Sequence, residues 1–181
     1  AIRRQRQMCI RDRDKGIIEK LYEASQAGVK IELIVRGICV LIPGIPGVSD
    51  NITVRSIVGR FLEHSRIFWF RNGGREELYI SSADWMPRNL NDRVELMVPI
   101  EDPEIKRRLK QMVDIELSDN QKAHIMQADG TWLKTISAEN QLCAQEYFQK
   151  IAEKRDAEDE MTLAQKLEPY TPVLGHGDGS D

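Results

Sequence analysis

A segment with helical periodicity runs almost directly into an apolar strand, and this succession constrains the fold more than any other feature. Apolar and small residues recur at positions 17, 18, 21, 22 and 25, and Gly28 is a natural C-terminal stop for such a helix. Residues 30–35 (KIELIV) then alternate into an apolar strand. A helix that leads into a buried strand is typical of α/β domains, in which helices cover a sheet.

The chain downstream continues this mixture of the two periods. Segments rich in β-branched and aromatic residues predict further strands at Asn51–Ile57, Arg66–Phe70, Glu77–Ser81 and Arg93–Ile100. Turns are predicted at Asn72–Gly74 and Asp129–Gly130, and helices at 103–117, after the capping pair Asp102 and Pro103, and at about Ser137–Lys154. We therefore expect an α/β fold in which helices flank a mixed sheet.

The two ends of the chain differ in charge from the middle. Residues 1–13 hold five Arg and one Asp, whereas residues 150–181 hold four bases and eight acids. The stretch MCIRDR at 8–13 back-translates to a sequence resembling a transposase end used in library preparation, so we expect 1–13 to be non-native. The alternative is a disordered basic arm. We expect a domain over 14–160 and a disordered tail over 161–181, where little can be buried.

Composition excludes several classes of protein. Hydrophobic residues make up 41% of the 181 residues, which suits a soluble globular chain, and no run approaches the ~20 apolar residues of a membrane span. The net charge of −3 argues against general nucleic-acid binding. Three widely spaced cysteines favour neither a zinc site nor a disulfide framework and are typical of the cytoplasm. Neither a Walker-type phosphate loop nor a Gly-x-Ser-x-Gly elbow is present.

Arginine dominates the central segment. Residues 30–100 contain eight Arg but a single Lys. Arginine grips phosphate oxygens with a planar two-pronged fork, although pairing with the eight nearby acids is an equally simple interpretation. Arg36 directly follows the apolar strand, where α/β sheets usually present their ligand-binding edge. His64, with Arg66 two residues on, precedes another strand, and the turn Ser81–Asp84 follows a third.

Four stretches are long and distinctive enough to compare with known families. They are GVKIELIVRGIC at 28–39, IPGIPGVS at 42–49, SIVGRFLEHSR at 56–66 and SSADWMPRNL at 81–90. Together they closely resemble the C-terminal catalytic domain of bacterial polyphosphate kinase, from about Asp14 to Asp119. The resemblance implies a phospholipase-D-like fold with two pseudo-equivalent halves, each of which donates a histidine.

The resemblance also implies an activity and roles for individual residues. The family transfers the terminal phosphate of ATP reversibly onto polyphosphate through a phosphohistidine. By motif, His64 is the second, catalytic histidine rather than the phosphorylated one, Arg36 matches an ATP-contacting arginine and Arg93 a phosphate-contacting arginine. From spacing alone, Arg66 orients His64 or neutralises phosphate charge. The family's phosphohistidine and magnesium-binding arginines lie upstream of this chain, so we expect a fragment whose Mg²⁺ ligands are in the missing half.

Two other functions stay open. Phospholipase D carries the pattern His-x-Lys-x4-Asp, but positions 66 and 71 are both Arg here, which argues against phosphodiester hydrolysis. A phospholipase-D-like phosphodiesterase or nuclease half-domain is the alternative, and a phosphate-binding module without chemistry is a third. The expected partners are ATP or ADP, inorganic polyphosphate, the upstream half of the same enzyme and further copies in a full-length homo-oligomer, but neither nucleic acid nor a membrane.

Overall fold

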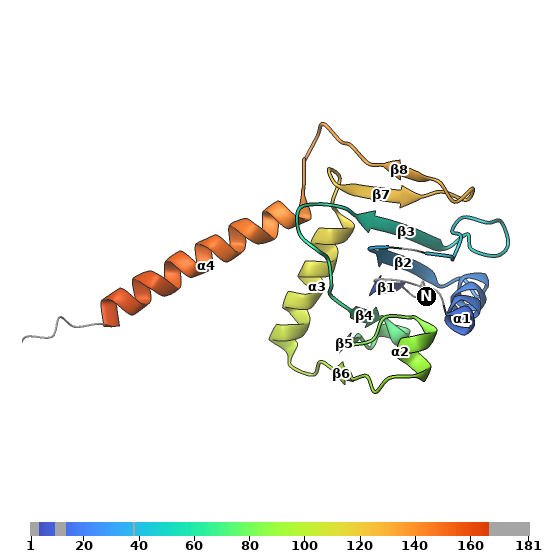
Figure 1. Cartoon of the computed structure of the whole chain (residues 1–181), viewed down its shortest axis with the longest axis horizontal. Coiled ribbons are helices and arrows are strands. Elements are labelled where there is room, and N and C mark those ends of the chain that lie inside the picture. Colours follow the sequence, from blue (N-terminus) through green and yellow to red (C-terminus); the bar gives the residue numbers. More distant parts are fainter. Residues whose placement is uncertain (1–3, 10–13, 38, 167–181) are drawn as a thin grey trace, which may run out of the picture. The chain divides into compact units, whose positions relative to one another are not determined.

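The computed structural model describes residues 4–9, 14–37 and 39–166. The described chain divides into two compact units, one that ends at Gln145 and one that begins at Glu146. The first unit contains an eight-stranded sheet with helices packed on it (Figure 1). The predicted α/β fold with a mixed sheet is confirmed, because the sheet contains both parallel and antiparallel neighbours.

The sheet is parallel in its centre and antiparallel on both sides. Its spatial order is β6-β5-β4-β1-β2-β3-β7-β8, in which β1, β2 and β3 are parallel neighbours and the remaining pairs are antiparallel. The strands are β1 (Arg4–Cys9), β2 (Lys30–Val35), β3 (Ile52–Ile57), β4 (Ile67–Phe70), β5 (Glu77–Ser81), β6 (Met97–Pro99), β7 (Ala123–Met126) and β8 (Trp132–Lys134). The helices are α1 (Lys15–Gln26), η1 (Asn72–Gly74), α2 (Pro87–Asn91), α3 (Pro103–Leu117) and α4 (Ala144–Lys166).

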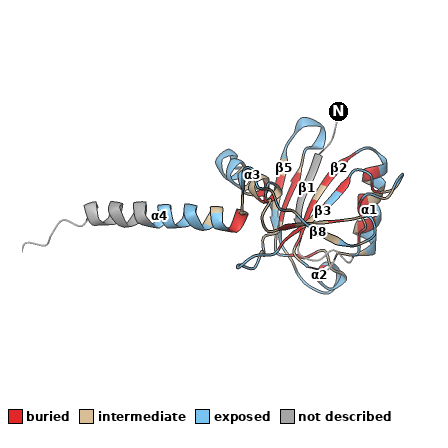
Figure 2. Cartoon of the chain, turned by 90° about the horizontal axis from the view of Figure 1, so that it is seen from above, coloured by how far each residue is buried: buried red, intermediate tan, exposed pale blue. Residues whose placement is uncertain are grey.

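Helices α1 and α3 cover opposite faces of the sheet. Leu33 of β2 belongs to the cluster that contains Leu21 of α1, whereas its neighbour Ile34 belongs to the cluster that contains Val113 of α3. Successive side chains of a strand point to opposite faces, so one strand serves both layers. Figure 2 shows the buried residues gathered on the strands and on the inner side of α1. This packing makes the central strands a rigid base for the loops at their ends.

Local signals place both long helices of the first unit. Asp14 Oδ1 accepts a hydrogen bond from Ile17 N at 3.0 Å, and Asp102 Oδ1 accepts from Glu104 N and Ile105 N at 2.9 Å each. These carboxylates satisfy N–H groups that a helix leaves without partners at its start. Gly28, after α1, has a φ of 82°, which a residue with a side chain adopts only with strain.

Strand β1 occupies the centre of the sheet, which the sequence did not predict. We expected residues 1–13 to be non-native or a disordered arm, and the disordered alternative does not hold for Arg4–Cys9. The physical reason is that β2 and β4 each present backbone groups toward this gap, and β1 pairs with both. Residues 1–3 and 10–13 lie outside the described residues, and the non-native origin of the segment stays a prediction.

Strand β6 is shorter than the strand predicted at Arg93–Ile100. It covers only Met97–Pro99, because the residues before it bind to the turn after β5 instead of to a ladder. Leu96 N donates to Ser82 Oγ, and Ser82 N donates to the Leu96 carbonyl, both at 3.0 Å. A serine hydroxyl that accepts from a nearby backbone N–H competes with sheet pairing.

Three short elements were missed. The predicted turn at Asp129–Gly130 joins β7 to β8, two strands that the sequence analysis did not predict, and α2 was missed as well. Gly130 has a φ of 81°, and Asp129 Oδ1 accepts from Thr131 N at 2.9 Å. Elements of three to five residues carry too little periodicity to be recognised.

The last helix begins and ends later than predicted. We expected it at about Ser137–Lys154, whereas α4 covers Ala144–Lys166. Residues 161–166 therefore belong to a helix rather than to the predicted disordered tail, consistent with the good helix formers in this stretch. Residues 167–181 lie outside the described residues. The predicted domain 14–160 spans parts of both compact units. Among the described residues, no helix has both the length and the hydropathy that crossing a bilayer requires.

Candidate active site

The predicted site residues are attached to one end of the sheet. Arg36 follows the carboxyl end of β2, and the loop that carries His64 and Arg66 leaves the carboxyl end of β3. That loop leads into β4, which is antiparallel to β1 and therefore begins at the same end. Ile67 in β4 pairs with Ile80 in β5, so the turn after β5 also lies there. Ligands of open α/β sheets commonly bind outside the carboxyl ends of the strands.

Arg36 reaches the residue next to His64. Its half-buried side chain donates from Nη1 to the Glu63 carbonyl oxygen at 2.6 Å. A guanidinium has five N–H donors, so one hydrogen bond to the loop leaves others for a phosphate. Arg36 and His64 are 28 positions apart in the sequence. The hydrogen bond from Arg36 to the Glu63 carbonyl oxygen links them through the Glu63–His64 peptide bond.

His64 is exposed on the loop at 58–66, between β3 and β4. An exposed imidazole is accessible to a ligand, and histidine is the side chain best suited to gain or lose a proton near neutrality. An isolated histidine often has a structural role in which its ring is buried, but the His64 ring is exposed.

Arg66 is committed to a carboxylate. Its Nε donates to Asp84 Oδ1 at 2.9 Å, and the two side chains are only 14% and 10% exposed. A second, longer hydrogen bond of 3.5 Å runs from Arg66 Nη1 to the His64 carbonyl oxygen. Between the two roles suggested by spacing, this geometry favours orientation of the His64 loop over neutralisation of phosphate, because the charge of Arg66 is already paired.

Arg93 lies beside the same group of residues but is not held as tightly. Its side chain is 61% exposed, and Nη1 lies 3.9 Å from Glu95 Oε1. Glu95 accepts hydrogen bonds from Ser82 Oγ and Asn89 Nδ2. These two bonds, assisted by the charges of Arg93 and Arg66, lower the pKa of the Glu95 carboxyl and keep it ionised. Glu95 is thus paired with Arg93, whereas Arg66 acts on it only through its charge.

A profile of the family described as "Polyphosphate kinase C-terminal domain 2" matches residues 9–145. The chain belongs to this family. Its sequence is 53% identical over 152 residues to the polyphosphate kinase of Staphylococcus haemolyticus, covering 84% of this chain and 21% of the relative. It is 56% identical over 128 residues to that of Pseudomonas aeruginosa, covering 71% of this chain and 19% of the relative. The chain therefore spans about a fifth of the length of these polyphosphate kinases.

Solved structures agree on the fold. The crystal structure of polyphosphate kinase from Porphyromonas gingivalis superposes with a TM-score of 0.81 at 40% identity, covering 87% of this chain and 24% of that one. The phospholipase D family member Nuc from Salmonella typhimurium gives a TM-score of 0.52 at 12% identity, covering 68% and 82%. NucT from Helicobacter pylori gives the same TM-score and identity. The polyphosphate kinase domain therefore has the expected phospholipase-D-like fold.

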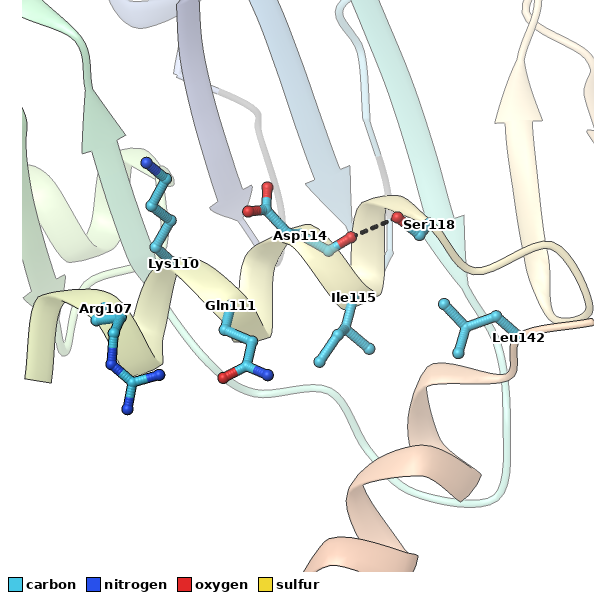
Figure 3. Close-up of a pocket in the computed structure, with 7 residues that line it drawn as sticks. All are labelled: Arg107, Lys110, Gln111, Asp114, Ile115, Ser118 and Leu142. Atoms are coloured by element: carbon cyan, nitrogen blue, oxygen red, sulfur yellow. Dashed lines mark hydrogen bonds between the residues drawn. The ribbon is translucent and has the colours of Figure 1, made fainter. Parts of the chain in front are cut away.

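Two surface hollows of this polyphosphate kinase domain lie along α3 and contain none of the four predicted site residues. The larger, of about 540 Å³, is drawn in Figure 3 and is lined by Arg107, Lys110, Gln111, Asp114, Ile115, Ser118 and Leu142. The smaller, of about 280 Å³, is lined by Trp69, Glu76, Leu78, Pro103, Lys106, Arg107 and Lys110. Within the described ranges, no group of three His, Cys, Asp or Glu side chains is arranged to hold a metal ion.

Several residues of the site escaped the sequence analysis. The Glu63 carbonyl oxygen accepts from Arg36, Gln145 binds the His64 loop, and Glu95 is loosely paired with Arg93. Glu63 adjoins His64 and could have been singled out on that ground. Gln145 carries no signal, because its partner Phe61 is 84 positions away in the sequence.

Proposed function

We propose that this chain is one catalytic half of a polyphosphate kinase and that it contributes His64 and Arg36 to phosphate transfer from ATP. The observation that carries the proposal is the link between Arg36 and His64 through the Glu63 peptide, at the end where open α/β sheets commonly bind ligands. The polyphosphate kinases to which the chain is similar support the reaction class.

In the proposed reaction, the terminal phosphoryl group of ATP is transferred to a histidine nitrogen in the upstream half. The bond between its phosphorus and the β–γ bridging oxygen breaks, a phosphorus–nitrogen bond forms, and ADP is released. The phosphoryl group is then transferred to the terminal oxygen of polyphosphate: the phosphorus–nitrogen bond breaks and a phosphorus–oxygen bond forms. Such transfers require positioning and charge neutralisation more than covalent help from the protein. Arg36 provides a permanent positive charge, and His64 provides a proton donor or acceptor.

The remaining expectations concern the longer protein. We propose, from the similarity to polyphosphate kinases, that the upstream half supplies the phosphorylated histidine and the Mg²⁺ ligands. ATP or ADP and polyphosphate are the proposed substrates. We also propose a cytoplasmic homo-oligomer for the full-length enzyme.

A phospholipase-D-like phosphodiesterase is the second candidate, because the fold is shared with Nuc. Arg at positions 66 and 71 departs from the hydrolase pattern, and Arg66 is paired with Asp84. A phosphate-binding module without chemistry is the third. An assay with a phosphodiester substrate distinguishes the second candidate from a kinase.

The proposal is tested by His64→Ala and Arg36→Lys in the full-length enzyme. A proton-handling group contributes about 10²–10⁴-fold, so His64→Ala lowers kcat by that range. Arg36→Lys keeps the charge but loses the fork, which lowers kcat/KM for ATP by about tenfold to a hundredfold for a lost charged hydrogen bond. Steady-state kinetics and a thermal melt are measured together. A His64→Ala enzyme that melts earlier but turns over at the wild-type rate per folded molecule would overturn the catalytic assignment.

A further inference from the structure

The loop that carries His64 is held by the side chain of Gln145, which follows Phe61 of that loop by 84 positions in the sequence. Gln145, which is buried, accepts a hydrogen bond at Oε1 from Phe61 N at 3.0 Å. Its Nε2 donates to the Phe61 carbonyl oxygen and to Glu63 Oε1, at 2.7 Å each. One amide thus satisfies both backbone groups of Phe61, as a neighbouring strand would, and fixes the side chain of Glu63 as well.

Gly59 leaves the room that this amide occupies. A Cβ atom at position 59 would lie 2.7 Å from Gln145 Cδ and closer still to Oε1. The end of a free glutamine could move aside, but this one makes three hydrogen bonds and cannot move without losing them. The φ of Gly59 is not positive, so the need for a glycine here comes from Gln145 rather than from the backbone conformation.

Gln145 is itself anchored to the turn after α3. Ala144 N donates to Asp119 Oδ2 at 2.8 Å, and Asp119 Oδ1 accepts from Lys122 N at 2.7 Å. Asp119 Oδ1 also accepts from N of Ala123, the first residue of β7, at 3.1 Å, so the turn is bound both to the segment that carries Gln145 and to β7. The amide of Gln145 reaches the loop from a fixed point.

The contacts meet at the residue before His64. The side chain of Glu63 is held by Gln145, and its carbonyl oxygen is held by Arg36. Positions and orientations of catalytic groups matter steeply, since a displacement of about 1 Å can cost about a hundredfold in rate. Because the loop itself is irregular, side-chain contacts of this kind decide where His64 stands.

We propose that Gln145 is a positioning residue for phosphate transfer: through Phe61 and Glu63 it fixes the loop that carries His64 relative to Arg36. This inference rests on the proposed function of His64. Gln145 does not touch substrate, so its removal acts only through the loop.

The test uses Gln145→Leu in the full-length enzyme, which keeps much of the volume and removes all three hydrogen bonds. We expect kcat to fall by about tenfold to a hundredfold, with a smaller change in KM for ATP. Gly59→Ala, which displaces the amide from the other side, lowers kcat in the same direction and guards against misfolding of the first variant. The matched control is Gln149→Leu, which leaves kcat unchanged. Gln149 is exposed on α4, and its described hydrogen bond runs along the same helix to Glu153.

A double mutant separates this inference from the proposed function. If Gln145 acts through His64, then Gln145→Leu has no further effect on kcat in a His64→Ala background. Full additivity of the two effects, or unchanged kcat in both Gln145→Leu and Gly59→Ala, overturns the positioning role while His64 keeps its own. Unchanged kcat in His64→Ala alone overturns the proposed function first.

Discussion

At the scale of single residues, one buried acid of α3 stands out. Glu116 of α3 is only 2% exposed, and its Oε2 has no hydrogen-bond partner among the described residues. Burial, followed by the charges of Glu63 and Asp119, raises the pKa of Glu116 to about 8. The side chain is therefore protonated at neutral pH, and a neutral acid avoids electrostatic repulsion with the Glu63 carboxylate.

This pKa predicts how stability depends on pH. An unfolded Glu has a pKa of about 4.3, so between that value and about 8 the folded chain holds a proton that the unfolded chain loses. The contribution to stability is complete below about pH 4.3 and is lost as the pH rises toward 8, at no more than about 1.4 kcal/mol per pH unit. Glu116→Gln, which cannot ionise, should therefore raise Tm over the wild type far more at pH 8 than at pH 5.

Thermal melts at the two pH values check this prediction. The exposed Glu101→Gln variant serves as the control for loss of one negative charge. Equal shifts of Tm at pH 5 and pH 8 would attribute the effect to packing instead of ionisation and would contradict the assignment.

At the scale of elements, the sequence correctly predicts those helix starts and strands that depend on residues close together in the chain. Asp102 and Pro103 start α3 where expected, and β5 has its predicted bounds, because capping and strand periodicity are local. Strand β1 and the short hairpin of β7 and β8 depend on pairing partners elsewhere in the chain, so their own residues do not reveal them. The same holds for the site: His64 and Arg36 stand in recognisable motifs, but the contact of Gln145 with Phe61 exists only in the fold.

The cap of α3 gives a test at this scale. Asp102→Ala removes the acceptor of two backbone N–H groups and should lower the free energy of unfolding by about 1 kcal/mol. Asp102→Asn retains an acceptor and should lose far less. Urea denaturation of both variants measures the difference, and equal stability of Asp102→Ala and the wild type would show that the cap contributes nothing.

At the scale of the whole molecule, the predicted site residues lie on loops at one end of the sheet, where the parallel strands β2 and β3 end. It spans about a fifth of the polyphosphate kinases that it matches, and the described hollows lie along α3, away from the four predicted site residues. A surface-exposed His64 next to a half-buried Arg36 is the arrangement expected of a half-site that a second half completes. We propose that phosphate transfer requires both halves and that this chain contributes His64.

The most direct measurement is polyphosphate synthesis from ATP by this chain alone, by the upstream half alone and by the two together. We expect neither half to make polyphosphate and the mixture to do so. The mixture that carries His64→Ala should lose about 10²–10⁴-fold of that rate, the range of a proton-handling group. Synthesis by this chain alone, or a mixture unaffected by His64→Ala, would contradict the account.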